Sequence, residues 1–95
     1  MSRSNESEKS SQVQILIIEE CEKIKNLLIS KNREYGNSAI EPKRIFSKAS
    51  SIEQIKVRID DKLSRIANDD IKEIKEDSLE DLIGYLILLK VAQRI

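Results

Sequence analysis

Several residue types are scarce in this chain, and their scarcity excludes whole classes of chemistry. The sequence has no histidine and no tryptophan, one cysteine, one proline, two glycines and three aromatic side chains. Without histidine there is no histidine-based triad, no imidazole general base and no histidine-ligated zinc. A single cysteine, Cys21, forms neither an intrachain disulfide nor a CxxC metal site. We expect Cys21 to be a reduced residue of the apolar core.

The residues that are abundant favour helices. Of the 95 residues, 36% are charged and 39% are hydrophobic, with much isoleucine and leucine and few turn formers. This composition predicts one small all-α domain. Because a chain of this size buries only about 60% of its unfolded surface, self-association is expected.

Basic and acidic side chains number seventeen each, but they are unevenly distributed. Residues 31–66 carry nine basic and five acidic side chains, a net charge of +4. That charge indicates an anionic partner and is too dilute for binding duplex nucleic acid. The polar start has no secretory signal, and the longest apolar run, residues 86–89, cannot span a membrane. We therefore expect a cytoplasmic protein without membrane partners.

Apolar spacing predicts three main helices and one short one. Residues 1–10 are polar and predict a mobile tail before a single helical domain over 11–95. Capping patterns at Ser11 and Ser51 predict helices over 12–33 and 51–67, and Gly36 predicts the turn that follows the first. A short helix is expected over 43–48, with Ile45 and Phe46 filling the gap between the long helices.

The last segment, 71–95, is apolar on nearly all sides from residue 82 onward. Its main face contains six residues, namely Ile74, Leu79, Leu82, Ile83, Leu86 and Leu89. A peripheral helix of a monomer would have a polar side. This segment therefore predicts a homo-oligomer formed through the C-terminal helix.

The turn after the first helix concentrates groups that suit a nucleotide. A base can stack on Tyr35 while Lys31 or Arg33 meets a phosphate, and Gly36 and Asn37 allow close backbone approach and amide contacts. The alternative is a plain helix end with Tyr35 packed against the bundle.

A row of cations follows on the helix over 51–67. Arg58, Lys62 and Arg65 fall within about 60° of one another around the helix axis and suit a phosphate or carboxylate. The alternative is ordinary surface pairing of Asp61 with Arg58 or Arg65.

An acidic stripe recurs every four residues, at Glu73, Asp77, Asp81 and then Tyr85. Carboxylates on facing helices can hold Mg²⁺, with Asp61, Asp77 and Asp81 as the ligands. Pairing of the stripe with the basic row is the simpler interpretation, because it needs no metal.

Three segments together carry a resemblance, namely residues 31–38 (KNREYGNS), 57–65 (VRIDDKLSR) and 76–85 (EDSLEDLIGY). Their order and spacing resemble a phage- and prophage-borne family, the nucleotide-modification-associated domain, which is similar to the all-α MazG-like nucleotide pyrophosphohydrolases. Glu34 and Gly84 depart from the family pattern, which has Asp and Asn there. The resemblance implies nucleotide handling without defining a reaction.

Three functions follow as hypotheses. The first is a non-catalytic, phage-type binding protein that sequesters a nucleotide immune signal, such as a cyclic nucleotide, against host defence. Its site comprises Lys31, Arg33, Tyr35, Gly36, Asn37, Arg58, Lys62 and Arg65, without a cofactor. The second is a Mg²⁺-dependent pyrophosphohydrolase that uses the three aspartates. The third is a protein–protein interaction module.

Overall fold

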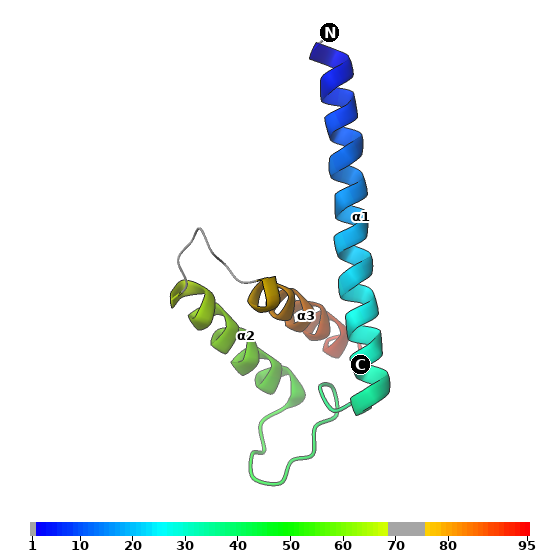
Figure 1. The fold of residues 1–95 in the computed structure, drawn as a ribbon. Coiled ribbons are helices and arrows are strands. Elements are labelled where there is room, and N and C mark those ends of the chain that lie inside the picture. The colour runs from blue at the N-terminus through cyan, green and yellow to red at the C-terminus, as the bar shows by residue number, and fades with distance from the viewer. Residues whose placement is uncertain (1, 69–75) are drawn as a thin grey trace.

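The computed structural model describes residues 2–68 and 76–95, and these residues form three helices. These helices are α1 (Ser2–Tyr35), α2 (Ser51–Asn68) and α3 (Glu76–Ala92). α2 packs along α3, while α1 makes a smaller contact with α3 and then projects away from both (Figure 1). The molecule is elongated, with extents of 63 × 30 × 22 Å. Its described residues contain no strand, which confirms the all-α class.

α1 begins earlier than its sequence predicts. It starts at Ser2, not at residue 12, so Ser11 lies within the helix and is not its N-cap. The physical reason is that residues 2–35 contain no glycine or proline to interrupt a helix. Mobility of residues 1–10 stays a prediction. At the other end α1 stops at Tyr35, and Gly36 follows with a φ of 67°, the left-handed conformation expected of it.

No short helix forms between α1 and α2. Residues 42–50 are irregular, so the helix predicted over 43–48 is wrong. Ile45 and Phe46 do not fill a gap, because they are 76% and 97% exposed. Six residues make too short a helix to persist without packing, and nothing described here packs against them.

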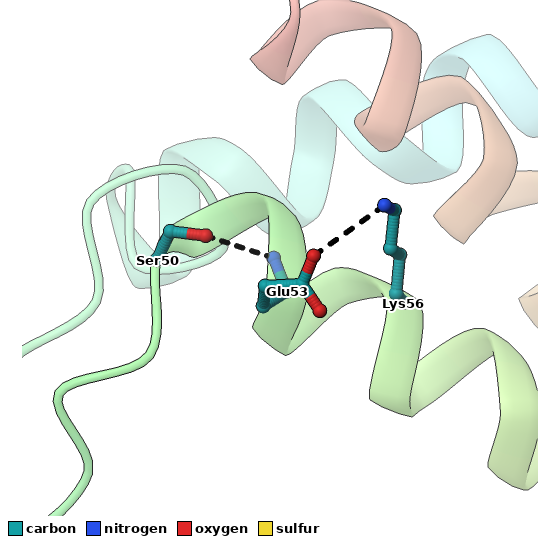
Figure 2. A network of polar contacts seen from close by, with 3 residues as sticks. All are labelled: Ser50, Glu53 and Lys56. Atoms are coloured by element: carbon teal, nitrogen blue, oxygen red, sulfur yellow. Dashed lines mark hydrogen bonds and ion pairs between the residues drawn. The ribbon is translucent and has the colours of Figure 1, made fainter.

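The N-terminus of α2 is capped one residue earlier than predicted. Ser50, not Ser51, accepts a hydrogen bond on its Oγ from the Glu53 backbone N–H at 3.2 Å (Figure 2). Glu53 also forms an exposed ion pair with Lys56 at 3.4 Å. Gln54 donates from Nε2 to the Ala49 carbonyl at 2.8 Å, which ties the preceding loop to the first turn.

Replacing Ser50 by alanine is expected to lower the free energy of unfolding by about 1 kcal/mol, because one helical N–H then loses its acceptor. Ser51→Ala is the matched control and is expected to change it by less than about 0.5 kcal/mol. Urea denaturation followed by circular dichroism measures both. Equal effects of the two variants would contradict the assignment of Ser50 as the cap.

The core is small and lies between α2 and α3. Ile55, Ile59 and Ala92 are buried there, surrounded by partly buried Ile52, Leu82, Tyr85, Leu88 and Leu89. On α1, Ile24 is buried. The core prediction for Cys21 is wrong, since its side chain is exposed in this chain. Cys21 lies on the apolar face of α1, where it lines an open groove between α1 and α3.

α3 is described from Glu76, so the predicted positions Ile71, Glu73 and Ile74 lie outside the described residues. Its apolar residues emerge on several sides, because Ile83, Leu86, Ile87 and Val91 are each 37–45% exposed. No described helix is both long and apolar enough to cross a membrane.

Candidate functional site

The turn after α1 is held by one amide side chain. The Nδ2 group of Asn32 donates to the Gly36 carbonyl at 3.2 Å and to the Asn37 Oδ1 at 2.9 Å. The Asn37 carbonyl in turn accepts the backbone N–H groups of Ile40 and Glu41. Because Gly36 alone supplies the left-handed step, these bonds fold residues 36–40 back toward α3.

A cavity of about 170 Å³ lies between the end of α1, this turn and α3. Its apolar wall includes Leu27 and Leu28 of α1, Ile40 of the turn and Leu88 of α3. Such a wall suits the flat face of an aromatic ring. The cavity is partly open to solvent, so a larger ligand can extend out of it.

Two tyrosines and two asparagines add specific groups to this wall. Tyr35 and Tyr85 both line the cavity, and Tyr35 is 65% exposed while Tyr85 packs against the core. Asn32 and Asn37 line it beside them. The Asn37 Nδ2 makes no hydrogen bond with any described residue, which leaves a donor for a ligand.

The α3 side of the cavity depends on Gly84. This residue is buried, and a Cβ placed on it would lie 3.2 Å from the Leu28 Cδ2 of α1. Glycine therefore permits the close approach of α1 and α3 at the cavity. In the resemblance this position is an asparagine that would meet a ligand, whereas here it is a packing position.

Two carboxylates at the cavity are paired with lysines from different helices. Asp81 Oδ2 lies 3.0 Å from Lys62 Nζ of α2, and these side chains are 33% and 14% exposed. Glu80 Oε1 lies 3.2 Å from Lys23 Nζ of α1. The acidic stripe and the basic row thus meet through Asp81 and Lys62. α3 is held between its neighbours by these two pairs.

Lys31 also lines the cavity, and it makes no ion pair with a described residue. The charged residues of the lining are Lys31, Glu80 and Asp81, and the two carboxylates are paired with lysines that lie outside the lining. Since the carboxylates are already neutralised, Lys31 is the cation that a phosphate would meet.

The eight predicted ligand residues do not gather in one place. Four line the cavity, namely Lys31, Tyr35, Gly36 and Asn37. Arg33 instead lines an adjoining groove between α1 and α3 that shares Asn32 and Asn37 with the cavity. The basic row does not line the cavity: Lys62 reaches it only through Asp81, Arg65 pairs with Asp61 at 3.4 Å, and Arg58 is exposed on α2.

The three aspartates proposed as metal ligands are also separate. Asp61 faces Arg65 along α2, Asp77 is exposed on α3, and Asp81 pairs with Lys62. Among the described residues, no group of three or more histidine, cysteine, aspartate or glutamate side chains is placed to hold a metal ion.

Sequence reasoning missed several residues of the cavity. Asn32 belongs to the motif over residues 31–38, but its hydrogen bonds to the turn depend on the left-handed conformation of Gly36. Lys23 and Glu80 are 57 positions apart, and no spacing along either helix indicates their pairing. Leu28 and Gly84 meet only because α1 crosses α3 at this level.

Comparisons with protein-family models, with curated proteins and with solved structures found no match to this chain. The resemblance to nucleotide-handling proteins therefore stays a prediction, and the geometry of the cavity has to support any function by itself.

Proposed function

We propose that the chain binds a nucleotide-type ligand, without turnover, in the cavity between α1, the turn and α3. The observation that carries this proposal is that Lys31 lines a largely apolar cavity together with two tyrosines, the Asn37 amide and two carboxylates that are each paired with another lysine. A base stacks on a tyrosine ring, the amide meets its polar edge, and Lys31 meets a phosphate.

The proposed role is sequestration of a nucleotide signal, such as a cyclic nucleotide, in the cytoplasm of a phage-infected cell. This role rests on the resemblance, whereas binding rests on the cavity. A protein that only sequesters its ligand needs affinity and no catalytic group, which suits a site with amides, tyrosines and one unpaired lysine. Self-association through α3 remains part of the proposal.

Calorimetry with mononucleotides, cyclic di- and oligonucleotides and ADP-ribose derivatives tests the proposal. At least one member of this panel is expected to bind with a dissociation constant below about 100 µM. No binding across the panel at that concentration would contradict it.

Two variants locate the site within the chain. Tyr35→Ala is expected to weaken binding about tenfold, because base–aromatic stacking contributes roughly 1–3 kcal/mol. Phe46→Ala removes an aromatic side chain outside the cavity and is the matched control. Lys31→Ala is expected to weaken the binding of phosphorylated ligands and to leave the binding of nucleosides unchanged. Lys43→Ala is its control. Equal loss in a variant and its control would contradict the assignment.

Incubation with (d)NTPs and Mg²⁺ separates binding from pyrophosphohydrolysis. A binding protein releases no pyrophosphate. Release that is lost in Asp77→Ala would favour the enzyme instead, and an absence of any ligand would favour the interaction module.

A further inference from the structure

The chain exposes far more surface than a compact monomer of its size. Its accessible surface is 8124 Å² for a mass of 10.9 kDa. Folded monomers of that mass expose about 5600 Å². The excess of about 2500 Å² is comparable to what one subunit buries in an obligate dimer.

A long segment of α1 is part of this exposed surface. The half of α1 nearest the N-terminus stands clear of α2 and α3 (Figure 1). It carries five large apolar residues that are 45–61% exposed, namely Val13, Ile15, Leu16, Ile17 and Ile18. At about 100° per residue these side chains point to all sides of the helix, and a helix that is apolar all round is normally buried on more than one side.

A surface that fits this segment lies at the other end of the same helix. A groove of about 700 Å³ runs between α1 and α3, with Ile24 and Ile29 on one wall and Ile83, Ile87 and Val91 on the other. α3 meets α1 only near the C-terminal end of α1, so the other half of this 34-residue helix is left uncovered (Figure 1). A second copy placed antiparallel along α1 would bring its own α3 to the uncovered half.

The charges of α1 favour the same antiparallel arrangement. Residues 6–22 carry five acidic side chains and one basic, whereas residues 23–35 carry four basic and one acidic. The net charges are −4 and +3. Glu19, Glu20 and Arg33 make no ion pair with a described residue, so they remain available across an interface. Parallel pairing would place like charges together.

We propose that the chain forms an antiparallel dimer along α1, in which residues 13–18 of each copy fill the groove between α1 and α3 of the other. The two copies exchange the same surfaces, as a two-fold interface requires. Both segments of α1 then have α3 neighbours, one from their own chain and one from the second copy.

Light scattering and sedimentation at about 100 µM chain test the dimer. The wild-type mass is expected to be twice 10.9 kDa. Ile17→Glu places a charge in the apolar segment and is expected to raise the dimer dissociation constant at least tenfold. Val57→Glu makes the same kind of change at a residue of α2 that is 65% exposed, and this control is expected to remain dimeric. If Ile17→Glu loses helical content, Leu16→Ala tests the dimer instead. This milder variant is expected to weaken the dimer and to keep the fold.

A spin-label distance tests the direction of the helices. In a Cys21→Ser background, a label on Ser10→Cys is expected to lie about 30 Å from its copy, from the 1.5 Å rise per residue and a two-fold axis near position 21. A parallel pair would bring the labels to about 10 Å. The proposal is overturned by this short distance, by a monomeric wild type, or by equal dissociation of Ile17→Glu and Val57→Glu.

Discussion

Gly84→Leu is expected to lower the free energy of unfolding by about 1–3 kcal/mol and to remove ligand binding. The Cβ of any other residue at this position lies within 3.2 Å of the Leu28 Cδ2. A leucine side chain adds three further carbons there, so α1 must move away from α3. Because Gly84 and Leu28 both line the cavity, this movement changes the site together with the packing.

Gly84→Ala is the matched control for this prediction. The contact of its single Cβ with Leu28 is too close by a few tenths of an ångström, and the end of the Leu28 side chain can move by that amount. Alanine also stabilises a helix interior by roughly 0.5–1 kcal/mol relative to glycine. We therefore expect Gly84→Ala to change stability by less than about 1 kcal/mol. Denaturant unfolding at one fixed chain concentration measures both variants, and a Gly84→Leu variant as stable as wild type would contradict the close approach of α1 and α3.

Lys62→Ala is expected to lower the free energy of unfolding by about 1–2 kcal/mol, since it leaves Asp81 partly buried without its cation. The pair is 3.0 Å apart, and the Lys62 side chain is only 14% exposed. The same variant is expected to weaken the binding of phosphorylated ligands, because the unpaired Asp81 carboxylate at the cavity then repels them.

The ion pair of Lys56 with Glu53 provides the control on the same helix. Both side chains are more than half exposed, and the atoms are 3.4 Å apart (Figure 2). Lys56→Ala is expected to change stability by less than about 0.5 kcal/mol, as for most surface pairs. A double-mutant cycle of Lys62→Ala with Asp81→Asn measures the coupling. A coupling near zero would contradict the account of Asp81 as a neutralised carboxylate.

The sequence predicted helix features well where the signal lies within a few residues of the feature. The spacing of Ile55 and Ile59 marks the buried face of α2, and Gly36 marks the end of α1. Capping was predicted one residue late, because Ser50 and Ser51 are adjacent and both precede a suitable partner. The start of α1 was misplaced because a capping pattern does not end a helix that lacks a breaker.

The apolar stripe of α1 shows where sequence reasoning stops. Val13, Ile17, Cys21 and Ile24 share one face, and periodicity predicts that all four are core residues. In this chain only Ile24 is buried, because α3 covers α1 only near its C-terminal end. Periodicity identifies a face that must be covered, but it does not identify the element that covers it.

The candidate site was predicted only in part for the same reason. The four predicted cavity residues come from the last turn of α1 and the turn that follows it, and their proximity follows from the chain itself. The contributions of Asp81, Gly84 and Tyr85 depend on how α3 is placed against α1. The basic row of α2 was expected at the site because its cations share one side of a helix, yet it does not line the cavity.

Nuclear magnetic resonance titration of the chain with its tightest ligand from the nucleotide panel tests the central claim most directly. If the cavity binds the ligand, the largest shifts of backbone amide signals are expected at Gly36, Asn37 and Tyr85. Little change is expected at Arg58 and Arg65. Shifts concentrated on that row of α2, with the turn after α1 unaffected, would contradict the account.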